Sequence, residues 1–166
     1  MKVIRLTGDD WQTLREVRLA ALADAPHAYG STLAKEQGLD EAEWRRRLDT
    51  ALGVLAVRNA ENAGIVGVHC PEPDTPMLVA MWVSPAHRGH AVGDALITEM
   101  MLWLRQCSLR KLRSEEKRWS RVVLRVAEGN DAARNLFLRH GFTPTGQHEP
   151  LESDPGVRTE ILTRPL

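Results

Sequence analysis

The apolar positions of the chain repeat with a helical period in some segments and with a strand period in others. Helical spacing joins Trp11, Leu14, Val17 and Ala21, and an aspartate just before this stripe can cap its first turn. A second helix is predicted over residues 40–50, where acidic side chains precede basic ones as the helix dipole favours. These two segments predict helices near the start of the chain.

Short apolar runs elsewhere predict the strands of a sheet. The run at 77–83 is nearly all apolar, which is typical of a strand covered on both faces. Proline and glycine breakers predict an irregular stretch at 24–39 and loops at 71–76 and 143–156. The expected strands are residues 2–6, 53–59, 63–70, 77–83, 120–128 and 157–164, with a hairpin between the second and third.

Two further helices are expected in the second half of the chain. After residue 91, a stripe joins Val92, Leu96, Met100 and Trp103, and the charged stretch 105–119 either prolongs this helix or forms a solvated excursion. Another helix is expected over 130–142, with a polar cap at its start and a glycine as its stop. Strands interleaved with helices around a hairpin predict a mixed sheet with helices packed on it.

Composition and charge narrow the classes of function. The chain has 166 residues, enough for a single domain spanning 1–166. It carries 22 basic and 22 acidic residues, so its net charge of zero gives no field to gather a polyanion. A nucleic-acid adaptor would rest only on residues 110–113 and the arginines at 118, 121 and 125, and we do not expect nucleic acid as a partner.

The N-terminus, the cysteines and the histidines give expectations about location, burial and metal binding. The N-terminus is charged within its first ten residues and has no apolar signal, and no apolar run is long enough to span a bilayer. We therefore expect a cytoplasmic protein with no membrane contact. Cys70 is predicted to be a small buried residue at a strand end. The six histidines are scattered, so no metal site is predicted.

A basic, glycine-bearing turn lies where the strand 77–83 gives way to the next helix. The first N–H groups of a helix lack intrahelical partners and lie at the positive end of its dipole, so they suit an anion such as phosphate. Arg88, Gly89 and Gly93 could complete a phosphate cradle, because glycine permits close approach and arginine suits phosphate. The alternative is an ordinary turn whose glycines serve tight packing. Neither the Walker loop nor the dinucleotide-binding pattern fits.

The turn resembles the acyl-coenzyme A signature of the GNAT superfamily of N-acetyltransferases, "[QR]xxGx[GA]". Arg88, Ala91 and Gly93 fill its three positions, with alanine in place of the usual middle glycine. Pro85, shortly upstream, also resembles the family, and residues 128–146 are similar to its "N..A..LY...GF" block. The pairing of the two blocks at the right places in the chain makes the resemblance specific.

The resemblance implies a fold and an activity. The fold would be α/β (α+β), a GNAT-like mixed, curved central sheet with helices on both faces and a V-shaped splay between two parallel strands, 77–83 and 120–128. The activity would be transfer of an acetyl group from acetyl-CoA, as cosubstrate, to a primary amine of a small molecule or peptide by direct attack. Homodimers are common among such proteins, although this sequence gives no evidence of its own for one.

The resemblance also implies which residues bind the cofactor. Main-chain groups of Met81 and Val83 would meet pantetheine and the thioester carbonyl, where an N–H would favour the charge that builds up on attack. Alanine supplies the N–H that the cradle needs but restricts positive φ, so Ala91 is predicted to keep a helical φ while coenzyme A still binds. The full implied set is Met81, Val83, Arg88, Gly89, His90, Ala91, Val92, Gly93, Asp94, Asn130 and Phe137.

Phe137 is the main departure from the family pattern, which commonly has tyrosine there as the acid for the leaving thiolate. Phenylalanine has no proton to give, although a thiol of pKa about 8.5 leaves with little help. An acyl-CoA-binding or sensing module with little or no turnover is therefore the alternative function. Tyr29, the only tyrosine, lies in a variable region and is not assumed to replace it.

No catalytic base is assigned from the sequence. Six residues qualify by chemical type, although each is individually typical of a solvated surface. Residues 25–52 and 147–157 are expected to line the site of the acceptor, whose identity no motif reveals. The candidates are Glu36, His87, His148, Glu149, Glu152 and Asp154.

Overall fold

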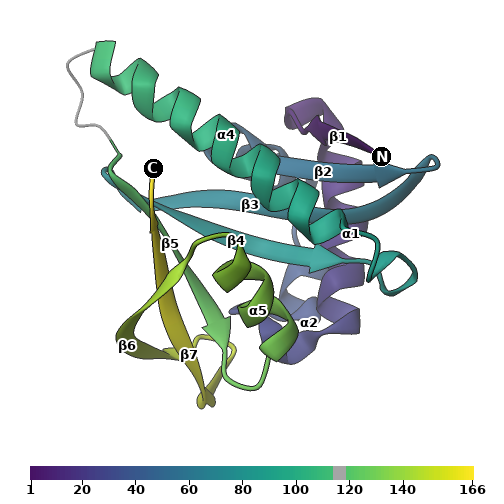
Figure 1. The fold of residues 1–166 in the computed structure, drawn as a ribbon. Helices are drawn as coiled ribbons and strands as arrows, with labels where there is room; N and C mark the ends of the chain where they lie inside the picture. The colour runs from purple at the N-terminus through teal and green to yellow at the C-terminus, as the bar shows by residue number, and fades with distance from the viewer. Residues whose placement is uncertain (114–118) are drawn as a thin grey trace.

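The computed structural model describes residues 1–113 and 119–166, and within them seven strands form one mixed sheet (Figure 1). The sheet order is β1-β2-β3-β4-β5-β7-β6. The strands are β1 (Lys2–Arg5), β2 (Leu52–Arg58), β3 (Glu61–Glu72), β4 (Thr75–Val83), β5 (Arg121–Ala127), β6 (Thr143–Leu151) and β7 (Asp154–Pro165).

The helices cover both faces of this sheet. In Figure 1, α4 and α5 lie in front of the sheet, and α1 and α2 lie behind it. The α-helices are α1 (Trp11–Asp24), α2 (Leu33–Gln37), α3 (Glu41–Thr50), α4 (Val92–Arg113) and α5 (Asp131–Arg139), and short 3₁₀ turns occur at Gly8–Asp10, Pro26–Ala28 and Pro85–His87. This arrangement confirms the predicted fold class.

Each face of the sheet has its own apolar core. Neighbouring strand residues alternate between them, so Val54 joins the core under α4 and α5 while Leu55 joins the core under α1 and α3. The apolar stripe of α4 is confirmed, because Val92, Leu96 and Met100 are fully buried against the sheet. Strands that are buried on both faces read as continuous apolar runs, which is why the central strands were visible in the sequence.

The parallel pair predicted between the two apolar runs is β4 and β5. Their recorded register joins Met77 to Val123 and Leu78 to Leu124, near the start of each strand. The cavity described below separates the strands beyond these pairs. The V-shaped splay between two parallel strands is therefore present.

Three segments differ from the sequence prediction. Residues 71–76 are mostly strand, since β3 runs to Glu72 and β4 starts at Thr75. Residues 143–151 form β6, whose prolines are tolerated because β6 lies at the edge of the described sheet, where β7 is its neighbour. The stretch 24–39 contains the short helix α2, whose N-cap is Thr32.

The structure also answers the expectations for Cys70 and for the charged stretch 105–119. The prediction that Cys70 is buried is wrong: it is exposed, because the far end of β3 extends out of the core. The helix α4 continues to Arg113, so the charged stretch prolongs the helix to that point, while residues 114–118 lie outside the described part of the chain. Within that part, no helix combines the length and apolarity needed to cross a membrane.

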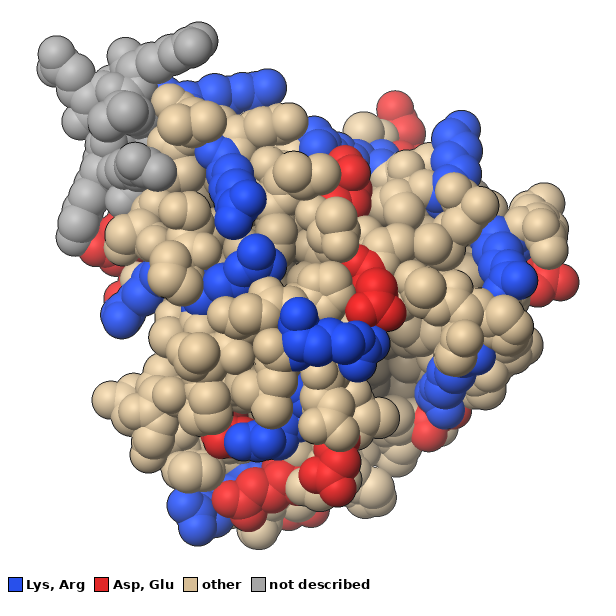
Figure 2. Space-filling view, viewed as in Figure 1, with Lys and Arg blue, Asp and Glu red and all other residues tan. Residues whose placement is uncertain are grey.

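Acidic and basic side chains are intermixed on the face shown in Figure 2. Blue and red groups lie beside one another there, as expected for a chain with equal numbers of each. This mixing fits the ion pairs recorded across the surface, such as Arg139 with Asp94 and Arg134 with Glu160.

Candidate active site

A cavity of about 1050 Å³ occupies the space where β4 and β5 diverge. The end of α1 and the 3₁₀ turn Pro26–Ala28 line it from one face of the sheet, and the starts of α4 and α5 line it from the other. All the predicted cofactor residues except His90 border this cavity. The fold therefore brings together residues from β4, the glycine turn and α5 that are far apart in the sequence.

A β-bulge in β4 shapes the centre of the cleft. Ile65 pairs with Trp82 and Gly67 with Val79, so Ala80 and Met81 together face the single residue Val66 of β3. Ala80 has a left-handed φ of 56°. Such a bulge re-aims the main chain, and here it affects Met81, which borders the cleft.

The turn before α4 contains two left-handed residues. Gly89 has φ 75° and Ala91 has φ 58°. The prediction that Ala91 keeps a helical φ is therefore wrong. The chain leaves the 3₁₀ turn at His87 and must enter α4 at Val92, and left-handed conformations at Gly89 and Ala91 make this reversal. Alternation of this kind forms a concave nest of N–H groups, here at the positive end of a long helix.

The helix α5 supplies the remaining wall. Asn130 is its N-cap, and the side-chain oxygen accepts a hydrogen bond from the Ala133 N–H at 3.3 Å. Phe137 is 4% exposed and packs edge-on against Phe142, with ring centroids 5.8 Å apart. Phe137 thus gives the cleft an apolar surface without a proton donor.

A family model described as an acetyltransferase (GNAT) domain matches residues 50–144. This chain belongs to the GNAT acetyltransferase family. The matched region runs from the start of β2 to the start of β6, so it contains β4, the nest and α5. Among curated proteins, none is similar in sequence to this GNAT chain.

Solved structures share the fold of this GNAT protein at low sequence identity. Ribosomal-protein-alanine N-acetyltransferase from Brucella melitensis has a TM-score of 0.77 and 16% identity, with 100% of each chain covered. A GNAT-family acetyltransferase from Streptococcus pneumoniae has a TM-score of 0.74 and 18% identity, covering 99% of this chain and 100% of that one. The putative acetyltransferase yncA from Salmonella typhimurium, solved with its cofactor acetyl-CoA, has a TM-score of 0.74 and 18% identity, covering 100% and 94%.

The Arg88 side chain of this GNAT protein turns away from the nest. Its guanidinium pairs with Asp24 at the end of α1, and its Nε donates to the Val83 carbonyl at 3.1 Å. Asp24 also accepts from the Trp82 Nε1 at 2.9 Å. What Arg88 offers to a ligand in the nest is therefore its main chain. His90 lies outside the cleft, exposed, with its Nδ1 2.9 Å from the Arg88 carbonyl oxygen.

Gly93 and Asp94 join the start of α4 to α5. A Cβ at Gly93 would lie 2.9 Å from Leu136 Cδ2, so any larger residue would require the Leu136 side chain to shift, in line with the packing alternative. The Asp94 carboxylate accepts from the Arg139 guanidinium at 3.1 Å and lies 2.9 Å from His140 Nε2. These contacts, led by the hydrogen bond from Arg139, hold the pKa of Asp94 below its usual range.

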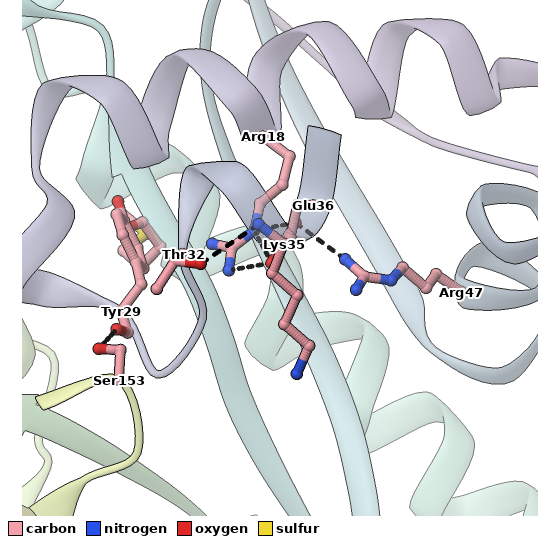
Figure 3. Close-up of polar contacts among 8 residues, drawn as sticks. Arg18, Tyr29, Thr32, Lys35, Glu36, Arg47 and Ser153 are labelled. Carbon is pink, nitrogen blue, oxygen red and sulfur yellow. Dashed lines mark hydrogen bonds and ion pairs between the residues drawn. The ribbon is translucent and has the colours of Figure 1, made fainter. Parts of the chain in front are cut away.

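Glu36 is a structural residue in this fold and not a base facing the cleft. Its side chain is 1% exposed and is held by Arg18 at 2.9 Å and by Arg47 at 3.0 Å (Figure 3). Burial by itself would raise the pKa of Glu36, but hydrogen bonding and charge from Arg18, followed by Arg47, outweigh it and lower that pKa. The arginines thus keep Glu36 ionised in the core.

Of the other base candidates, His87 borders the cleft, with its Nε2 3.2 Å from Glu61 Oε2. Those from the β6–β7 region, His148, Glu149, Glu152 and Asp154, do not border it. Sequence reasoning missed two carboxylates that do, Asp24 and Glu128. No linear motif marks them, because each reaches the cleft only through the packing of its element.

Tyr29 belongs to the segment 25–52 that was expected to line the acceptor site, and the structure packs it against β4. It is 8% exposed, borders the cleft, and its hydroxyl donates to the Met81 carbonyl at 3.0 Å. The Arg18 guanidinium lies 4.8 Å from its ring centroid, and Ser153 donates to its main-chain oxygen at 2.5 Å (Figure 3). Tyr29 and Met81 are 52 positions apart, so no local pattern could have revealed their contact.

Replacing Ala91 with glycine should raise the free energy of unfolding by about 1 kcal/mol, because a left-handed conformation strains alanine more than it costs glycine. Urea denaturation measures the change. The matched control is Ala95→Gly in the first turns of α4, where glycine should instead destabilise by about 1 kcal/mol. Equal destabilisation by both substitutions would contradict the assigned strain.

Proposed function

We propose that this GNAT protein transfers the acetyl group of acetyl-CoA to a primary amine of a small molecule or peptide. The proposal rests mainly on one observation: the bulge at Met81 and the nest that precedes α4 border the same cleft. As part of this proposal, residues 1–166 form a single domain and the protein acts in the cytoplasm.

The residues present fit coenzyme A. Main-chain N–H groups of the nest, from Gly89 to Asp94, would hold its diphosphate at the positive end of α4. Nothing lies within 4 Å of a Cβ built at Gly89, and Ala91 is exposed, so the nest is open to a ligand. Between the separating strands β4 and β5, the apolar walls would hold the pantetheine arm, beside the Asn130 side chain.

The chemistry asked of the protein is modest. Acetyl-CoA supplies a thioester when bound. The Met81 N–H would stabilise the negative charge that develops on the carbonyl oxygen during attack. Because a thiol has a pKa of about 8.5, the thiolate can depart beside the apolar Phe137 without an acid. Neither Cys70 nor Cys107 borders the cleft, which favours direct attack by the amine over an acyl-cysteine intermediate.

The test is release of free thiol from acetyl-CoA with a panel of primary amines containing peptides, polyamines, aminoglycosides and amino acids. Amine-dependent release is expected for at least one class. Calorimetry with coenzyme A and acetyl-CoA accompanies the panel as a measure of binding.

Phe137 favours the second candidate function, an acyl-CoA-binding module that turns over poorly, because this wall of the cleft lacks a hydroxyl. Binding of acetyl-CoA with no thiol release across the panel would support this candidate over the enzyme. No binding of either compound would overturn both.

A further inference from the structure

The buried hydroxyl of Tyr29 borders the cleft and contacts the Met81 main chain. We propose that Tyr29 holds the attacking amine, with its phenolic oxygen accepting an N–H of the acceptor beside Met81. This inference rests on the proposed function and adds to it the residue that meets the acceptor. It differs from a role for tyrosine on α5, where Phe137 stands.

The direction of the existing hydrogen bond decides what Tyr29 can offer. A tyrosine hydroxyl has one proton to donate and lone pairs that accept. Its proton is already committed to the Met81 carbonyl, 3.0 Å away, which has no proton to give in return. The phenolic oxygen is therefore available to a ligand as an acceptor, and donation to a carbonyl strengthens it in that role.

The two sides of the cleft separate the two substrates. The nest and α5 line one side, while Asp24 and the turn Pro26–Ala28 lead to Tyr29 on the opposite side. Met81 borders both, because its main chain lies at the bulge between the strands. An amine that enters from the Tyr29 side thus meets a hydroxyl that is hydrogen-bonded to the carbonyl of Met81. The N–H assigned to the thioester carbonyl belongs to the same residue.

Contacts with Arg18 and Ser153 hold Tyr29 in place, and its hydroxyl stays protonated. Arg18 stacks 4.8 Å from the ring centroid, and Ser153 fixes the Tyr29 main chain from the β6–β7 turn (Figure 3). Burial raises the pKa of Tyr29 to about 12, although Arg18 and Arg88 oppose it and Asp24 adds to it. Tyr29 is accordingly an orienting group and does not act as a base.

The reaction balances without any change at Tyr29. The amine nitrogen uses its lone pair to form a C–N bond to the thioester carbonyl carbon, and the C–S bond breaks with its electron pair on sulfur. One proton leaves the nitrogen to solvent, and the thiolate takes up a proton from solvent. Tyr29 accepts an N–H from the neutral amine and so points the nitrogen lone pair toward the carbonyl carbon.

The test compares wild type with Tyr29→Phe, which keeps the ring against Arg18 and removes only the hydroxyl. The probes are acetyl-CoA with glycinamide, whose amine is half neutral at about pH 8, and with each amine accepted in the panel. We expect kcat/KM for the amine to fall about tenfold, the worth of one hydrogen bond, while the Kd for coenzyme A stays unchanged. The pH profile should keep its shape, because Tyr29 does not titrate in that range.

The matched control is Thr159→Val, which removes a buried hydroxyl that donates to the Glu149 carbonyl at 2.9 Å, away from the cleft. Both variants should lose similar stability, but only Tyr29→Phe should lose amine kcat/KM. Unchanged kinetics in Tyr29→Phe, an equal loss in Thr159→Val, weakened coenzyme A binding or an altered pH profile would each overturn the proposal. Wild type that binds coenzyme A but accepts no amine would instead refute the proposed function.

Discussion

Replacing Glu36 with alanine will lower the free energy of unfolding by about 3–5 kcal/mol, the usual cost of removing one partner from a buried ion pair. Glu36 is 1% exposed, and its carboxylate compensates two arginines. Arg18 is itself mostly buried, and among the described residues its Nη1 has no hydrogen-bond partner. Without Glu36, the Arg18 charge would remain in the core uncompensated. Urea denaturation followed by tryptophan fluorescence measures the loss.

The matched control for this prediction is Glu43→Ala. Glu43 pairs with Arg46 at 2.6 Å on the outer face of α3, where solvent screens the pair. Stability should change little in this variant. A loss in Glu36→Ala no larger than that in Glu43→Ala would contradict the structural role assigned to the triad of Arg18, Glu36 and Arg47.

The same triad should make the protein sensitive to acid. The folded-state pKa of Glu36 lies below its ordinary value of 4.5, so its stabilisation is fully present above that pH and is lost as the pH falls through the folded-state value. The variant Glu36→Gln lacks this titration. The stability difference between wild type and Glu36→Gln should therefore shrink as the pH is lowered below 4.5.

Replacing Ala91 with glutamate should weaken coenzyme A binding by about 2 kcal/mol, or roughly thirtyfold, because a carboxylate at the nest would repel the diphosphate. Ala91 is exposed, so the longer side chain displaces nothing in the core. Calorimetric titration with coenzyme A measures the effect. This prediction depends on the proposed place of the diphosphate and is independent of the identity of the acceptor.

The neutral variant Ala91→Gln separates charge from size. It carries a side chain of the same length on the same left-handed backbone, so it should bind coenzyme A far better than Ala91→Glu. The difference between the two should also diminish at high salt, which screens an exposed charge. Equal affinities at low salt would place the diphosphate elsewhere.

The sequence by itself determined the family, the central strands and the principal helices. The stripe from Val92 to Met100 and the apolar run of β4 are periodic patterns. Such patterns predict structure reliably, because each residue's burial follows from the face of the helix or strand on which it lies. The signature from Arg88 to Gly93 is similarly local, since one turn contains all its parts. The parallel pair then followed from the resemblance.

Only the tertiary structure decided how the site is completed and which polar residue belongs to the core instead. Sequence reasoning gave Ala91 a helical φ, but the reversal between β4 and α4 imposes a left-handed one. It ranked Glu36 with the solvated carboxylates, but two arginines from separate helices hold it in the core. It set Tyr29 aside, yet packing of the turn before α2 against β4 puts its hydroxyl on Met81. Each depends on contacts between residues distant in the chain, which a local pattern does not encode.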